Sequence, residues 1–181
     1  MGDTYCNLVP VRVGNASASD VGAKVVRHLI NRKIVSDRLT NCVLGEEGGY
    51  APGDNYRHAI DDPYDYILDQ STNGLAVNLG RQVFYAAGVD QVLCPNCKEN
   101  IVDTGWEDAM DEWVNETGND ILTCPSCGHS YSITEYIFEP NWAFGELGFT
   151  FWNWGGQFKD EFIKELEQLT GSTISVVYGK L

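Results

Sequence analysis

The sequence has no long apolar run and is poor in basic residues. No window of about 18 consecutive apolar residues occurs, so we expect no membrane-spanning helix. Only 12 lysines and arginines stand against 26 aspartates and glutamates, which gives a formal net charge of −14 at pH 7. Because proteins neutralise the phosphates of nucleic acids with Lys and Arg, this composition argues against a nucleic-acid partner.

The beginning of the chain has no targeting pattern. The stretch "MGDTYCNLVP" contains no basic segment followed by an apolar one, and Cys6 stands where a myristoylation signal would have Ser or Thr. We therefore expect a cytoplasmic protein. In that compartment the six cysteines are expected to be reduced, because cytosolic thiols rarely form stable disulfides.

A recognisable catalytic motif is also missing. Neither a glycine-rich phosphate loop nor a serine or cysteine nucleophile pattern can be assigned. His58 lies near Asp61 and Asp62, a combination that can carry acid–base chemistry. Helix capping by the aspartates beside a surface histidine explains the same residues and is the favoured interpretation. We expect no enzymatic activity; the alternative is a small enzyme whose active site lies near the 37–73 loop and uses His58.

Four of the six cysteines form two Cys-Pro-x-Cys pairs, with 26 residues between the pairs. Each two-residue turn lets both sulfurs of a pair point at one centre, and two pairs complete the tetrahedron that zinc prefers. Gly128, just after the second pair, can take a left-handed conformation without steric cost. We predict one zinc ion per chain, with the ligands Cys94, Cys97, Cys124 and Cys127.

The stretches "CPNCKENI" and "CPSCGHSY" resemble the knuckles of a zinc ribbon with four cysteine ligands, over residues 92–133. The resemblance implies a structural zinc, because four thiolates close the site whereas a catalytic zinc keeps an open position. Two disulfides, a thioredoxin-type redox pair, or His129 in place of one cysteine are the alternatives. The resemblance does not extend to the rest of the chain.

The negative charge is concentrated around the cysteines. Residues 91–140 contain 10 acidic residues and one base, Lys98, whereas residues 1–90 and 141–181 are only weakly acidic. Between the two pairs, apolar residues at helical spacing predict a short acidic amphipathic helix: Trp106, Met110, Trp113 and Val114. This charge predicts an interaction or inhibitory module whose partner is a basic or hydrophobic protein surface.

Hydrophobic periodicity outlines the remaining elements. Strands are predicted at 4–13, 74–87, 144–154 and 172–181, and helices at 15–36 (N-cap Ser19) and 156–171. Residues 37–73 read as a long loop, with a short helix opened by Asp62 and Pro63. Without residues 91–140, the order is strand, helix, strand, strand, helix, strand.

That order predicts an α+β fold, a ferredoxin-like split βαβ sheet with two helices, interrupted by a zinc-ribbon insertion. The predicted domain organisation is residues 1–90 for the first half of the α+β domain, 91–140 for the insertion and 141–181 for the second half. If Phe149 and Phe151 face the helices, Trp152 and Trp154 lie on the opposite face of the sheet. There they are either covered by the insertion, which is favoured, or form a protein-binding patch.

Overall fold

The computed structural model describes residues 2–45, 47–63 and 66–181, and it combines α-helices with a mainly antiparallel sheet. Three α-helices occur in these residues: α1 (Asn15–Asn31), α2 (Trp106–Asn115) and α3 (Asp160–Thr170). None of the helices in this part of the chain is long and apolar enough to cross a membrane.

Six strands form the main sheet, in the order β12-β1-β10-β5-β3-β2, and neighbouring strands are antiparallel. Their bounds are β1 (Thr4–Pro10), β2 (Val35–Thr40), β3 (Gly49–Pro52), β5 (Leu75–Phe84), β10 (Ala143–Trp152) and β12 (Ile174–Lys180). Three two-stranded pairs accompany it: β4 (Ile60–Asp61) with β11 (Gln157–Phe158), β6 (Gln91–Leu93) with β9 (Ile137–Glu139), and β7 (Ile121–Thr123) with β8 (Ser130–Ser132).

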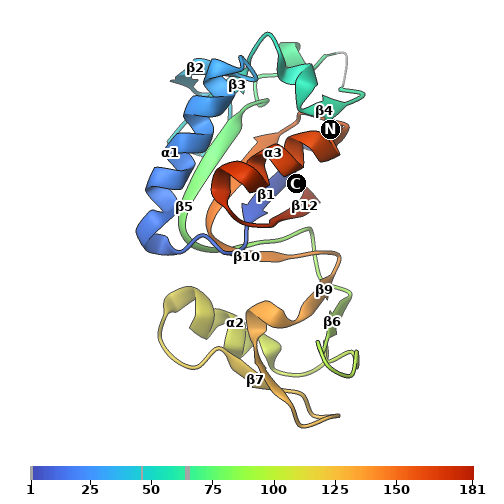
Figure 1. Cartoon of the computed structure of the whole chain (residues 1–181). Coiled ribbons are helices and arrows are strands. Elements are labelled where there is room, and N and C mark those ends of the chain that lie inside the picture. Colours follow the sequence, from blue (N-terminus) through green and yellow to red (C-terminus); the bar gives the residue numbers. More distant parts are fainter. Residues whose placement is uncertain (1, 46, 64–65) are drawn as a thin grey trace.

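The main core lies between this sheet and helices α1 and α3 (Figure 1). Alternation along β10 turns Leu147, Phe149 and Phe151 to the helices, as predicted, and all three are almost completely buried. They meet Leu29 of α1 and Phe162 of α3 in one continuous cluster. Residues 91–140, here called the cysteine segment, lie between β5 and β10 in sequence and form the lower lobe in Figure 1.

Helix α1 differs from its predicted bounds at both ends. It begins at Asn15, with Gly14 as an N-cap that makes no side-chain capping bond, so the prediction of Ser19 as the N-cap is wrong. It ends at Asn31 because Lys33 takes a left-handed conformation (φ 57°), and the chain then enters β2. Of the apolar residues after the helix, Val35 begins this strand and Ile34 directly precedes it.

The prediction of a long loop at residues 37–73 is wrong for the part that forms β2 and β3. These strands pair with each other, and Tyr50 of β3 pairs with Leu75, so the hairpin widens the sheet. Glycines that suggested a loop allow close packing instead: a Cβ atom on Gly53 would lie 2.3 Å from the carbonyl oxygen of Lys33. The short helix predicted after Asp62 falls partly on residues 64–65, outside the described residues, and Ile67–Asp69 forms a 3₁₀ turn.

The two tryptophans at the end of β10 have different environments. Asn153 takes a left-handed conformation (φ 55°) and redirects the chain, so Trp154 enters the main core beside Phe151, with ring centroids 4.8 Å apart. The prediction that Trp154 lies on the opposite face is therefore wrong. Trp152 lies beside Tyr5, with ring centroids 5.3 Å apart. It stands at the end of β10 that is remote from the cysteine segment.

The opposite face of the sheet is partly covered by residues of the same chain. The Phe84 ring lies over Gly148, where a Cβ atom would approach it to 2.2 Å, and packs in a small cluster with Val9. The strand predicted at 4–13 ends earlier, at Pro10. Next to this cluster, Thr150 donates to Asn7 at 2.6 Å.

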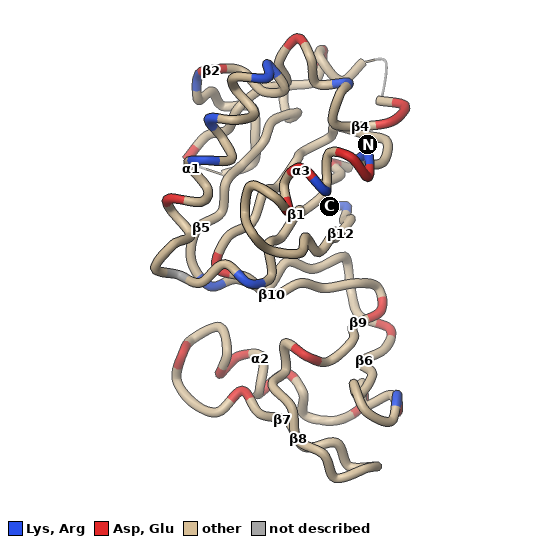
Figure 2. Tube along the Cα trace, in the orientation of Figure 1, with Lys and Arg blue, Asp and Glu red and all other residues tan. Residues whose placement is uncertain are grey.

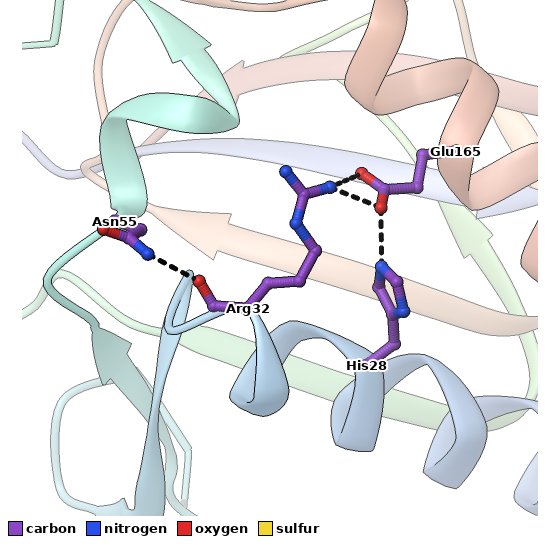
Figure 3. A network of polar contacts seen from close by, with 4 residues as sticks. All are labelled: His28, Arg32, Asn55 and Glu165. Atoms are coloured by element: carbon purple, nitrogen blue, oxygen red, sulfur yellow. Dashed lines mark hydrogen bonds and ion pairs between the residues drawn. The ribbon is translucent and has the colours of Figure 1, made fainter.

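A charged network joins α1 to α3 on the surface of the core (Figure 3). The Glu165 carboxylate contacts His28 Nε2 at 2.6 Å and also the Arg32 guanidinium. Asn55 donates to the Arg32 carbonyl at 2.9 Å, which ties the turn after β3 to the same helix end. Although desolvation opposes it, hydrogen bonds from His28 and Arg32 lower the pKa of Glu165.

We predict that Glu165→Gln lowers the free energy of unfolding by about 0.5–1 kcal/mol at pH 7. Since the folded-state pKa is below the unfolded value of about 4.3, this stabilisation is present above that pH and is lost as the pH falls through the folded-state pKa. Urea titrations of both proteins between neutral and acidic pH measure the difference. Glu161→Gln is the matched control, because Glu161 is exposed on the same helix. A Glu165→Gln deficit that does not shrink in acid would contradict the role of the carboxylate charge.

Candidate metal centre

The four predicted cysteine ligands lie together. All four Sγ atoms are within 4.8 Å of one another, with Cys94 3.8 Å from Cys127 and Cys97 3.7 Å from Cys124. A tetrahedral ion with metal–sulfur distances of about 2.3 Å requires sulfurs about 3.8 Å apart. These separations are too long for a disulfide. The cluster could therefore bind one metal ion.

The two knuckles have the same backbone conformation. In the first, the N–H of Cys94 donates to Glu99 and the N–H of Lys98 donates back to Cys94; in the second, Cys124 pairs in the same way with His129 and Gly128. Lys98 (φ 62°) and Gly128 (φ 72°) are both left-handed. The glycine predicts this turn, whereas the equivalent lysine does not. Each knuckle thus closes a small hairpin that presents two sulfurs to the centre.

Hydrogen bonds lower the pKa of one of the four thiols, that of Cys127. The backbone N–H of His129 and the amide of Asn96 lower the pKa of the Cys127 thiol to about 5. Although the backbone N–H of Glu99 acts in the opposite direction, desolvation and hydrogen bonds with the other sulfurs raise the pKa of Cys97 to about 12. These hydrogen bonds favour the thiolate form at Cys127, and a bound metal ion would favour it at all four sulfurs.

Two of the ligands belong to a second hydrophobic cluster. Cys94 and Cys124 are fully buried among residues that include Trp106 of α2, Ile133 and Phe138. The Trp106 ring meets Phe138 edge-on at 5.5 Å. Cys97 is exposed and Cys127 is half-buried, so the centre lies at the edge of this cluster.

Arg81 of β5 connects the cysteine segment to the main sheet. Its Nε donates to Glu146 Oε1 at 2.9 Å, its Nη1 donates to the Trp113 carbonyl at 3.1 Å, and its guanidinium lies 5.0 Å from the Trp113 ring. Glu146 is only 8% exposed, and its Oε2 has no hydrogen-bond partner within the part of the chain that the structure describes. The β-bulge between Gly145 and Leu147 places this carboxylate.

Sequence reasoning did not single out Arg81 or Glu146. The available signal was weak: each is a charged residue inside an otherwise largely apolar strand. A charged residue in that position usually points to solvent, and only the three-dimensional structure shows that the two lie face to face.

The remaining candidate residues are not among the four cysteines of this centre. His58 is exposed, and its side chain has no hydrogen bond or ion pair with any described residue, so no described carboxylate prepares it for acid–base work. His129 is outside the ligand group and its ring stacks on Tyr131. Cys6 and Cys42 are buried, and burial raises the pKa of Cys6 to about 12.

Comparison with protein-family models, with curated proteins and with solved structures found no significant match.

We predict that the purified protein binds one metal ion per chain and that serine in place of any one ligand weakens this binding by about a hundredfold or more. Elemental analysis gives the stoichiometry, and competition with a chelator gives the affinity. Cys42→Ser is the control, because Cys42 is buried outside the cluster. With the metal bound, thiol reagents should modify no cysteine rapidly; after chelation, the four ligands should react. Full reactivity before chelation would contradict a metal centre.

We predict that Arg81→Ala lowers the free energy of unfolding by roughly 3 kcal/mol, because Glu146 would keep a buried charge without a cation. Arg81→Ala combined with Glu146→Ala should cost less than the sum of the two single substitutions. Urea denaturation measures all three variants. Arg38→Ala is the control: this arginine is exposed and has only Asp37 nearby, at 3.8 Å. Equal effects of Arg81→Ala and Arg38→Ala would rule out the proposed role of Arg81.

Proposed function

We propose that this protein is a non-enzymatic interaction module, in which a structural zinc ion holds an acidic segment that binds a basic protein partner. The observation that carries the proposal is the exposed, almost unpaired set of carboxylates around a closed four-thiolate centre.

The sulfur geometry and ligand type support zinc. Tetrahedral sets of four thiolates are typical of zinc and of iron, and zinc adopts this geometry without redox chemistry. Cys94, Cys97, Cys124 and Cys127 would hold the ion and fill all four positions, so none remains for a substrate. A reducing compartment such as the cytoplasm would keep these sulfurs available as thiolates. Bound zinc would cross-link the two knuckles and so stabilise the fold of the segment.

The arrangement of strands supports the proposed topology. Leaving out the β2–β3 hairpin and the cysteine segment, the elements β1, α1, β5, β10, α3 and β12 follow the β-α-β-β-α-β order of a ferredoxin-like domain. On this interpretation, the cysteine segment is a zinc-ribbon insertion between the two central strands, and the hairpin is an addition at the edge of the sheet.

The surface charge supports a basic partner. Eight acidic residues of the cysteine segment are exposed: Glu99, Asp103, Glu107, Asp108, Asp111, Glu116, Glu135 and Glu139. Of these eight, Glu116 alone lies within ion-pair distance of a base among the described residues: its Oε1 is 3.6 Å from Arg81 Nε. Figure 2 shows this segment with acidic residues along its length and a single basic one, Lys98. Such a surface attracts cationic proteins and repels phosphates.

We predict that neutralising Asp103, Glu107 and Asp111 together (Asp→Asn, Glu→Gln) weakens partner binding about tenfold at low salt, because exposed charges act over a Debye length of about 10 Å at 0.1 M salt. Affinity capture from a lysate of the cells that make the protein, followed by mass spectrometry, identifies the retained proteins. High salt should release them, and they should be basic.

The control variant loses the same number of acids elsewhere, at Asp20, Asp37 and Asp54, which are exposed on the rest of the chain. It should retain the same proteins as the unchanged chain. Retention that is indifferent to salt and equal for both triple variants would remove the electrostatic account.

A further inference from the structure

A hollow of about 440 Å³ opens where α2 of the cysteine segment meets the end of β5. We call it the junction hollow. Its lining is predominantly apolar and aromatic, and comes from three places in the sequence: the residues are Arg81, Gln82, Val83, Tyr85, Met110, Val114 and Trp142. Its volume is within the range of protein sites that accept small molecules or single side chains.

The aromatic wall of the hollow is preformed. Trp142 is held by a hydrogen bond from its Nε1 to the Gly88 carbonyl at 3.2 Å and by stacking on Phe138 at 5.2 Å. Tyr85 stands 5.4 Å from Trp142, and 53% of it is exposed. An exposed tyrosine beside a fixed tryptophan is typical of the central contacts of protein interfaces.

The opposite wall is a strip of α2 with acidic neighbours. Met110 and Val114 lie one helical turn apart and face the hollow. Glu107 and Asp111, each three residues before one of them, are therefore adjacent on the helix surface, and both are exposed. The one base in the lining, Arg81, is already bonded to Glu146 and to the Trp113 carbonyl. The hollow is thus apolar inside and negatively charged along the helix that borders it.

We propose that the junction hollow receives a large apolar side chain from a basic segment of the partner protein, with Lys or Arg residues beside it that meet Glu107 and Asp111. This inference rests on the proposed function and specifies the chemistry of the partner. Burial of the side chain against Tyr85 and Met110 supplies affinity, and the charge pairs supply orientation and rate of association.

The site depends on the metal because its two walls belong to different parts of the chain. Tyr85 follows β5 and is positioned by the main sheet, whereas Met110 packs against the hydrophobic cluster that includes Cys94 and Cys124, and Val114 lies one turn further along the same helix. Loss of the metal would release α2 and remove one wall. Binding of the partner segment should therefore require the occupied metal centre.

Three synthetic peptides test the proposal by fluorescence anisotropy. The first has a central tryptophan flanked by lysines and arginines, the second has alanine at the centre, and the third has glutamates as flanks. Only the first should bind well. Tyr85→Ser and Met110→Ala should each weaken its binding about tenfold, whereas Leu39→Ser, at an exposed leucine on β2, should have no effect. Circular dichroism and metal content verify that each variant is folded.

The outcomes separate this inference from the proposed function. Binding that needs the basic flanks but ignores the central residue, Tyr85 and Met110 would refute the hollow while leaving the acidic module intact. Equal binding of the acidic-flanked peptide would refute the electrostatic basis of both. Absence of binding by the first peptide, or tighter binding of a single-stranded oligonucleotide sensitive to Tyr85→Ser, would overturn the assignment of this hollow to a basic segment. Chelation should abolish binding and added zinc should restore it; binding that survives chelation would refute the metal dependence.

Discussion

The antiparallel pairing of β5 with β10 is the interaction on which both hydrophobic clusters depend. Each strand has ten residues, and their pairing extends from Leu75 opposite Phe151 to Phe84 opposite Ala143. At one end, the pair carries Leu147 and Phe149 into the core beneath the helices. At the other end, Val83 and Phe144 belong to the cluster around the cysteines. The hydrophobic cluster of the cysteine segment therefore includes residues from the end of the β5–β10 pair of the main sheet.

The negative charge of the cysteine segment opposes its folding, whereas a metal ion held by its cysteines would stabilise it. Many like charges in a short stretch oppose compaction, because exposed carboxylates repel one another when no bases lie between them. A tryptophan-rich hydrophobic cluster opposes this repulsion, Arg81 supplies one positive charge where α2 meets the sheet, and a metal ion held by the four cysteines would add positive charge at their centre. A metal ion bound there would help the segment to keep a strongly negative surface. Under the proposed function, that surface binds a basic partner.

Local patterns predicted local structure well. The spacing of the cysteines indicated that their sulfurs converge, because a two-residue turn can bring a pair together without help from the rest of the fold. Periodicity predicted a helix where α3 lies, and alternation predicted correctly that Phe149 and Phe151 of β10 face the helices. It failed for β2 and β3, where glycines that permit close packing resemble a loop. It also failed for Trp154, whose burial depends on the left-handed conformation of Asn153.

The sequence by itself determined the candidate metal ligands, the acidic character of the segment that carries them and the approximate places of α1, β5, β10, α3 and β12. These properties depend on neighbouring residues and on composition. Only the tertiary structure decided that Arg81 meets Glu146, which lies 65 residues further along the chain, and that Tyr85, Met110 and Trp142 border one hollow. Contacts of this kind arise from the register between β5 and β10 and from the packing of α2. No short stretch of the sequence contains that information, because each partner is placed by a different element of the fold.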